Sequence, residues 1–212
     1  MSTAILKDRS GSKKAGFTLV VFTKNAKIGS VKTRIAQVKG NAYAYKLHNL
    51  LLDYLKKSLA ELEGWKIVVY YSDSVDTKDP WPKGVEKKIQ VGNDLGERMF
   101  QALEAELKTA ETVMLMGSDV PDFSIDLLTA AKTYAADGSL VLGPSTDGGY
   151  YLIGGKSISK VIFDQVIWGS DQVLAQTIDR INLLGVKVKM LPELADIDLV
   201  GDIPPRIIKQ LR

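Results

Sequence analysis

The sequence predicts an α/β protein with three layers, in which helices cover both faces of a mostly parallel mixed sheet. Two observations support this fold class. First, short apolar runs alternate with longer segments whose apolar residues recur every three or four positions, as strands alternate with helices in such folds. Second, the expected strands come closer together after residue 143, which indicates a hairpin or a mixed-sheet portion rather than a second independent domain.

The expected elements follow from these patterns in chain order. The first strand, residues 17–23, is apolar almost throughout, as expected where both faces of a sheet are covered. The clearest helix spans residues 41–62 and ends at Gly64. The other strands are expected at 65–71, 87–91, 112–116, 140–142, 150–153 and 186–191, and the other helices at 95–108, 124–136, 157–163, 171–184 and from about 199 onward.

The composition is that of an ordinary globular protein, with 45% hydrophobic and 25% charged residues in 212. No apolar run approaches the ~18 residues that a membrane helix needs. We expect residues 1–16 to be a disordered basic tail rather than a signal peptide, and residues 17–212 to form a single domain. Cysteine is absent, which excludes disulfides and thiolate chemistry and fits a cytoplasmic location.

The positive charge is concentrated near the amino terminus. Residues 1–34 carry eight Lys or Arg against one acid, Asp8, whereas the net charge of the whole chain is only +3. Nucleic-acid binders more often show a basic stripe with interleaved aromatic residues, which this chain lacks, so no nucleic-acid partner is expected. The local charge indicates a small anionic ligand.

The strand at 112–116 runs directly into Gly117 and two carboxylates, Asp119 and Asp122. Open α/β sheets bind ligands at the carboxyl ends of their strands, and an Asp there is suited to holding a hard cation against a phosphate. Asp122 is as well explained by capping the helix that begins near Ser124. Asp119 lies too far from that helix to reach its first-turn N–H groups, so a ligand role is favoured.

The loop after the first strand combines glycine with cations. Gly29 lets backbone N–H groups approach a diphosphate, and Lys32, Thr33 and Arg34 supply charge and a hydroxyl. The spacing is not that of a Walker A loop. A solvated basic loop is the alternative.

Residues 92–99 (GNDLGERM) allow two interpretations. Asp94 can cap the following helix with Glu97 in a capping box. Alternatively, Asn93 or Asp94 contacts a base or ribose, and Arg98 reaches a phosphate or pins the loop to the helix.

The segment from Thr146 to Tyr151 (TDGGYY) combines an acid with two glycines that enter a strand. Gly148 and Gly149 indicate a tight turn that brings backbone close to a ligand or to another strand. Asp147 is a candidate base or hydroxyl anchor, or a turn residue.

Two further features concern the end of the chain and its single histidine. Asp196 and Asp198 are two apart on an extended segment, so both carboxylates could face a metal, or Asp198 could cap the last helix. His48 has no His or Cys partner for a zinc site, and we expect it to be a surface or packing residue. The absence of a Ser-His pair disfavours covalent acyl transfer.

Four of these stretches occur in a familiar order: GSVKTRI, GNDLGERM, GSDVPD before a helix, and TDGGYYLIG. Together with Trp168, Ser170 and the closing residues 196–198, they resemble a largely uncharacterised family of bacterial GT-A-type glycosyltransferases, some of them associated with radical-SAM enzymes or with arsenosugar biosynthesis. The resemblance runs from about Leu19 to the end of the chain. It departs from the family pattern near Ile28, where a Pro is common, and at residues 168–171, where the family reads Trp-Ser-Thr.

The resemblance implies the nucleotide-diphospho-sugar transferase (GT-A) fold. Distant relatives of this fold include phospholactate guanylyltransferase and the molybdenum-cofactor nucleotidyltransferases. It also implies a divalent cation, Mg²⁺ or Mn²⁺, held by Asp119 and Asp198, phosphates enclosed by the first loop, and a nucleotide pocket that includes the second motif. Substrate contacts are expected from Gly148, Gly149, Tyr150 and Trp168.

The expected activity is metal-dependent glycosyl transfer from a nucleotide sugar to a small-molecule or glycan acceptor. The metal, Lys32 and Arg34 would stabilise the leaving nucleoside diphosphate, and Asp147 or Asp122 would orient or deprotonate the acceptor hydroxyl. The alternatives are a nucleotidyltransferase of the phospholactate guanylyltransferase type, which releases pyrophosphate, and a non-catalytic nucleotide sensor. The oligomeric state is left open, a homodimer being one option.

Overall fold

The computed structural model describes residues 14–211, so residues 1–13 of the expected basic tail lie outside the described part of the chain. The first strand, β1, begins at Ala15, two residues earlier than predicted. Among the described residues, no helix combines the length and the apolar character needed to cross a membrane.

The sheet contains seven strands within residues 14–211, in the order β3-β2-β1-β4-β6-β5-β7. Strand β6 runs antiparallel to both of its neighbours, β4 and β5, whereas the other pairings are parallel. This confirms the mostly parallel mixed sheet and its hairpin after residue 143. The strands are β1 (Ala15–Thr23), β2 (Lys66–Tyr71), β3 (Glu86–Ile89), β4 (Ala110–Gly117), β5 (Leu140–Pro144), β6 (Tyr150–Gly155) and β7 (Val188–Met190).

Six α-helices and two short 3₁₀ helices connect the strands of the described chain. They are α1 (Thr33–Lys39), α2 (Asn41–Ala60), α3 (Leu95–Leu107), α4 (Ile125–Ala136), η1 (Lys160–Ile162), α5 (Val173–Leu183), η2 (Val200–Asp202) and α6 (Pro205–Leu211). Helix α1 was not predicted, because only Ile35 of its seven residues is buried and no apolar periodicity marks it. The helix expected at 157–163 is reduced to the single turn of η1.

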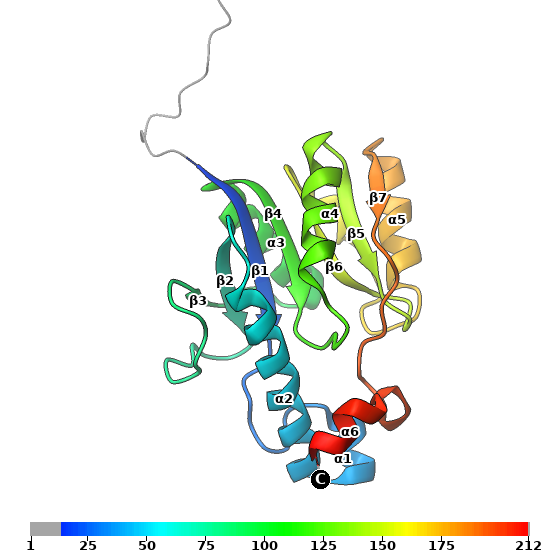
Figure 1. Ribbon diagram of the computed structural model, residues 1–212. Helices are drawn as coiled ribbons and strands as arrows, with labels where there is room; N and C mark the ends of the chain where they lie inside the picture. Colours follow the sequence, from blue (N-terminus) through cyan, green and yellow to red (C-terminus); the bar gives the residue numbers. More distant parts are fainter. Residues whose placement is uncertain (1–13, 212) are drawn as a thin grey trace, which may run out of the picture.

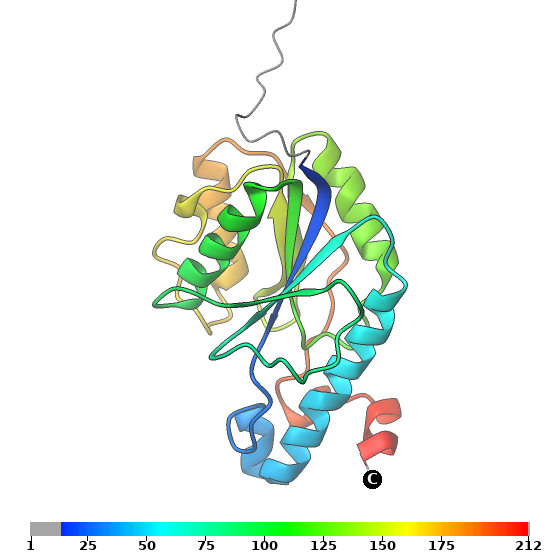
Figure 2. The same cartoon turned by 90° about the vertical axis from the view of Figure 1, so that its left-hand side faces the viewer.

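The helices form one layer on each face of the sheet, which confirms the three-layer prediction. The carboxyl-terminal half of α2 and the helix α4 pack on one face, where Leu55, Leu59 and Leu128 join a common core cluster with β1, β2 and β4. Helices α3 and α5 pack on the other face through residues such as Leu103 and Ile181. Figure 2 shows the sheet between these two layers.

A third apolar cluster lies beyond the carboxyl ends of the parallel strands. There α1, the first half of α2 and α6 gather around Ile35, Leu47, Ile197 and Ile207, and these three helices lie together at the bottom of Figure 1. Ile197 is fully buried in this cluster. The cluster therefore fixes the extended segment 196–198 beside the end of the sheet.

Strands β1 and β4 are neighbours at the point where the strand order changes direction, since β2 and β3 lie on one side and β6, β5 and β7 on the other. Loops that leave such a pair separate to opposite sides and open a crevice at the carboxyl ends. Lys24 follows β1, and Ser118 and Asp119 follow β4. The topology thus brings the predicted acidic turn and the predicted basic loop to one edge.

Candidate active site

Two cavities meet at this edge of the sheet. One has a volume of about 290 Å³ and contains Lys32, His48 and Asp198, and we call it the polar lobe. The other has a volume of about 300 Å³ and contains Asp147, Trp168 and Asp196, and we call it the aromatic lobe. Leu95, Gly117 and Asp119 line both lobes. The two lobes therefore form one cleft with the Asp119 carboxylate between them.

Lys32 holds three separate segments together at the floor of the polar lobe. Its ammonium lies 3.1 Å from Asp119 Oδ2 and donates a hydrogen bond to the backbone carbonyl of Ile197. The side chain is only 5% exposed, and the residue adopts a left-handed backbone conformation (φ 47°) just before α1. Asp119 adds a backbone link, because its carbonyl accepts from the Ile197 N–H at 3.2 Å. The basic loop, the acidic turn and the segment 196–198 thus form one connected structure.

The other predicted residues of the first loop differ in their positions. Thr33 lines the polar lobe. Arg34 pairs with Asp198 at 2.5 Å, and both side chains are partly exposed. Gly29 lies in an exposed turn with a positive φ of 88°, a backbone conformation that favours glycine. It is not among the residues that line the lobe. The alternative of a merely solvated basic loop does not hold for Lys32, which is buried.

Asp196 and Asp198 point into different lobes instead of facing one metal together. Ile197 between them is buried, Asp196 lines the aromatic lobe and Asp198 lines the polar lobe. Burial raises the pKa of Asp196, and the nearby Asp147 carboxylate raises it further. Asp198 does not cap a helix, since Asp202 accepts the N–H groups of Asp198 and Leu199 at the start of η2.

The aromatic lobe is walled by large apolar side chains: Leu95, Met99, Val120, Tyr150, Tyr151 and Trp168. Trp168 lies directly against Gly96 of α3, where an added Cβ would approach the indole Cζ2 to 2.4 Å. Only glycine at position 96 allows the indole to lie there. The second glycine of the GNDLGERM motif therefore serves Trp168, a role that the sequence did not reveal.

Asp147 is a turn residue that also lies at the aromatic lobe. Its Oδ1 accepts from Ser145 Oγ at 2.5 Å and from the Gly149 N–H at 2.9 Å, which makes it a turn residue. It also lines the aromatic lobe together with Gly149. At Gly148, φ is 85° and an added Cβ would lie 2.1 Å from the Asp171 carbonyl oxygen, so the close approach there is to another segment of the protein.

The second motif mainly builds the start of α3. Asp94 caps this helix by accepting from the Glu97 N–H at 2.8 Å, and Glu97 Oε2 accepts from the Asn93 N–H at 2.9 Å. Arg98 Nε donates to the Gly92 carbonyl at 3.0 Å and so pins the loop. None of Asn93, Asp94 and Arg98 is among the residues that line either lobe. The predicted nucleotide contacts of these three residues thus receive no support from the cleft, whereas their structural interpretation is confirmed.

Asp122 contacts the last helix rather than lining the cleft. Its carboxylate pairs with Arg206 of α6 at 2.5 Å, and it is not among the residues that line the two lobes. Of the two candidates for the acceptor base, only Asp147 therefore lines the cleft. The pair with Arg206 also ties the acidic turn to the last helix.

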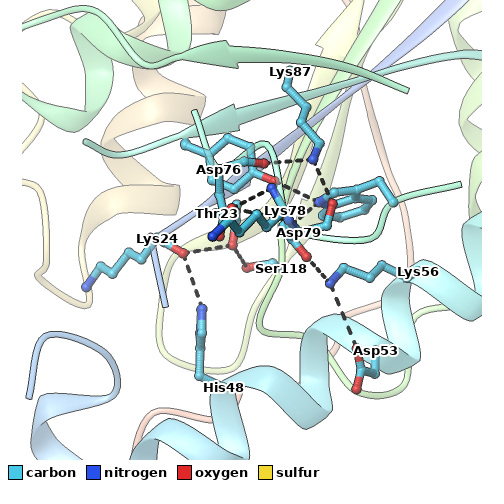
Figure 3. A network of polar contacts seen from close by, with 12 residues as sticks. Thr23, Lys24, His48, Asp53, Lys56, Asp76, Lys78, Asp79, Lys87 and Ser118 are labelled. Carbon is cyan, nitrogen blue, oxygen red and sulfur yellow. Dashed lines mark hydrogen bonds and ion pairs between the residues drawn. The ribbon is translucent and has the colours of Figure 1, made fainter. Parts of the chain in front are cut away.

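His48 is a site residue that the sequence analysis did not identify. It is 3% exposed and lines the polar lobe, and its Nε2 lies 3.3 Å from the Lys24 carbonyl oxygen. Figure 3 shows the ring pointing from α2 toward the end of β1. Burial lowers the pKa of His48, against the opposing charge of Asp119. A signal was present, because His48 follows Ala44 and precedes Leu51 and Leu52 in the buried stripe of α2.

The polar lobe contains two carboxylates, which are oxygen donors of the kind that hard divalent cations take. Asp119 and Asp198 are both partly exposed, at 46% and 40%, and both line the lobe. Within residues 14–211, no group of three or more His, Cys, Asp or Glu side chains is arranged to hold a metal. Mg²⁺ is commonly bound by only one or two carboxylates together with substrate phosphates, so two are sufficient.

Comparison with solved structures identifies a clear relative. A protein from Desulfovibrio desulfuricans G20, provisionally described as a nucleotide-diphospho-sugar transferase, is 32% identical with a TM-score of 0.80, over 88% of this chain and 84% of that chain. Among curated proteins, none matches the chain.

Two enzymes share the fold at lower identity. The 4-diphosphocytidyl-2C-methyl-D-erythritol synthase from Anaerococcus prevotii DSM 20548 is 13% identical (TM-score 0.58, 92% of this chain and 95% of that chain). The inositol-1-phosphate CTP transferase from T. maritima is 15% identical (TM-score 0.52, 94% and 96%). These likenesses concern the fold alone.

The family follows from a match between residues 55–170 and the model of a family described as "Uncharacterized protein conserved in bacteria (DUF2064)". The matched segment includes the acidic turn, the TDGGYY turn and Trp168. Together with the relative from Desulfovibrio desulfuricans, it confirms the predicted resemblance. The chain belongs to the bacterial DUF2064 family and has the α/β fold of the nucleotide-diphospho-sugar transferases.

Proposed function

We propose that the protein is a metal-dependent glycosyltransferase that uses a nucleotide-sugar donor. The observation that supports this most directly is the two-lobed cleft, in which Asp119 lines both a polar and an aromatic cavity. A group transfer needs two substrates that meet at one point, and this carboxylate stands where the two cavities join. The relative from Desulfovibrio desulfuricans is provisionally described as a nucleotide-diphospho-sugar transferase.

The polar lobe suits the diphosphate of the donor. Lys24 and Lys32 line this lobe. Arg34 is close to it, because it forms an ion pair with Asp198, which also lines the lobe. The Lys32 ammonium is almost fully buried and is held by Asp119 and by a backbone carbonyl, so it is already positioned before a ligand arrives. Fixed charges of this kind stabilise a leaving group whose negative charge develops during the reaction.

A divalent cation at Asp119 and Asp198 would supply further neutralisation of the leaving nucleoside diphosphate. At present Asp119 is paired with Lys32, and Asp198 is paired with Arg34. A bound ion would therefore share each carboxylate with the cation that already contacts it. Binding of nucleotide and metal is therefore expected to be mutually dependent.

The aromatic lobe suits the acceptor. Asp147 Oδ1 is occupied by two hydrogen bonds, whereas within the described chain Oδ2 has no hydrogen-bond partner. We assign this oxygen to the acceptor hydroxyl, which it can orient and deprotonate. Trp168 presents an aromatic surface in the same cavity.

A thermal-shift screen of nucleotides and nucleotide sugars, with and without Mn²⁺, tests the donor site. A ligand that binds only the native state raises the apparent melting temperature, and the proposal predicts a rise that needs nucleotide and metal together. If no nucleotide raises the melting temperature under either condition, the proposal is wrong.

Nucleotidyl transfer is the alternative, favoured by the fold shared with two nucleotidyltransferases of low identity. In that reaction an acceptor phosphate attacks the α-phosphate of the nucleotide and pyrophosphate leaves. Product analysis separates the two activities, since released nucleoside diphosphate supports glycosyl transfer and released pyrophosphate supports nucleotidyl transfer.

A further inference from the structure

The charge of the aromatic lobe differs from what a phosphorylated substrate requires. Three carboxylates line it, those of Asp119, Asp147 and Asp196, and no Lys or Arg is found among its described lining residues. Asp119 is paired with Lys32. Within residues 14–211, neither Asp147 nor Asp196 has a Lys or Arg in salt-bridge distance.

The neighbouring polar lobe is different in this respect. Lys24 and Lys32 line it, and its second carboxylate, Asp198, is paired with Arg34. Because like charges repel at short range, an anion is favoured in the polar lobe over the aromatic lobe. The cleft is thus divided into a side that accepts negative charge and a side that rejects it.

The apolar wall adds a second requirement. Trp168 lies against Gly96, and Leu95, Met99 and Val120 line the same cavity with apolar side chains. A ring with an apolar face buries area against such a wall, and a hydroxyl on that ring can point to the carboxylates.

We propose that the aromatic lobe selects an acceptor that carries no negative charge, namely a hydroxyl compound with a flat apolar face that is neutral or cationic. This inference rests on the proposed function, because it identifies the class of the second substrate of the same cleft. It disfavours phosphorylated and carboxylated acceptors, and therefore also nucleotidyl transfer onto a phosphate.

Three probes that share one phenol ring test the selection. Tyramine is cationic, 4-hydroxyphenethyl alcohol is neutral, and 4-hydroxyphenylacetate is anionic at neutral pH. Titration of the full chain, followed by tryptophan fluorescence and calorimetry, should give affinities in that order, with about a fivefold step between neighbours at low salt. High salt should compress the steps, because it screens charges.

Variants locate the effect in the lobe. The double variant Asp147→Asn with Asp196→Asn should bring the three affinities within about twofold of one another, because two of the carboxylate charges are removed. Trp168→Ala should weaken all three probes alike. Glu111→Gln, at the exposed opposite end of β4, is the matched control and should keep the original order.

Other outcomes overturn the proposal. Equal or tightest binding of 4-hydroxyphenylacetate to the unaltered chain contradicts the charge selection, as do affinity steps in the double variant that are as large as those of the unaltered chain. Failure of all three probes to bind contradicts the apolar requirement. A separate titration with nucleotides distinguishes failure of this inference from failure of the proposed function. If nucleotides do not bind but the three probes bind in the expected order, the polar lobe is not a nucleotide site, whereas the charge selection of the aromatic lobe is supported.

Discussion

Two carboxylates of the scaffold, Asp79 and Glu106, are paired with cations, whereas within the described chain two carboxylates of the aromatic lobe, Asp147 and Asp196, are not. Asp79, in the loop between β2 and β3, is paired with Lys56 and accepts from the Tyr71 hydroxyl at 2.8 Å and from Trp81 Nε1 at 2.8 Å, within a network shown in Figure 3. Glu106 of α3 is 1% exposed and accepts from the Tyr70 hydroxyl at 2.8 Å and from Lys88 at 2.5 Å.

In the cleft, Asp147 and Asp196 have no cationic partner among the described residues, and the pKa of Asp196 is raised instead of lowered. The difference teaches how to separate structure from function here. The carboxylates that serve the fold are satisfied by cationic donors, whereas Asp147 and Asp196, in the cavity that they line, lack a salt-bridge partner within residues 14–211, a property typical of binding and catalytic sites.

The largest expected effect is on turnover. Asp147→Asn should lower kcat by roughly a hundredfold or more, as is typical for loss of a general base, with little change in the melting temperature. Initial rates with a donor found by the nucleotide screen, together with thermal melts, measure this. If the variant turns over as fast as the wild type, Asp147 is not the general base, and the contrast between scaffold and cleft carboxylates loses its functional meaning.

The converse change concerns the scaffold. Glu106→Gln should lower the free energy of unfolding by about 2 kcal/mol, because Lys66 and Lys88 lose a buried charged partner, although their own partial exposure softens the loss. Nucleotide affinity should stay unchanged. Urea unfolding gives the free energy, and a variant as stable as the wild type would show that the buried pair contributes nothing.

Gly96→Ala should act on the acceptor side alone. The added methyl would collide with the Trp168 indole, which must move out of the aromatic lobe. We expect the KM for the acceptor to rise about tenfold, in line with the loss of an aromatic contact, while nucleotide affinity is unchanged. Gly201→Ala in η2 is the control, since nothing lies within 4 Å of an added Cβ there. Equal effects of the two substitutions would contradict the assigned role of Gly96.

The smallest effect is the pH dependence of stability. Burial raises the pKa of Glu106 and of Asp79, but hydrogen bonds from Lys88 and Lys56 and from the tyrosines outweigh it, so both pKa values lie below their usual ones. A lowered folded-state pKa gives stability that is present above the unfolded value, about 4, and is lost as the pH falls through the folded value. Unfolding free energies measured from neutral to acidic pH should fall less steeply for Glu106→Gln than for the wild type.

Much of the fold was predictable because the buried strands and amphipathic helices leave strong periodic patterns. Helix α1 was not, since a single buried residue, Ile35, leaves no pattern, and the left-handed conformation of Lys32 is unusual for lysine. Asp119 and Asp147 could be placed at the sheet edge from their positions after a strand and before one.

The remaining site residues depend on contacts that no local pattern encodes. Asp122 and Asp94 have the same residue type as the cleft carboxylates, yet one pairs with Arg206 and the other caps α3. Gly96 and Trp168 are far apart in sequence and meet only in the folded chain. His48 has no His or Cys partner in the sequence, which predicts a surface or packing residue, whereas the fold buries it beside the polar lobe.

The central claim is that Asp119 holds the metal and nucleotide at the junction of the two lobes, and the Asp119→Asn variant tests it most directly. Calorimetric titration with a nucleotide in the presence of Mn²⁺ should show loss of the metal-dependent part of the affinity, while circular dichroism and thermal melts show a folded chain. Glu111→Gln, at the far end of the strand that precedes Asp119, should bind as the wild type does. Unchanged metal-dependent affinity in Asp119→Asn would contradict the account.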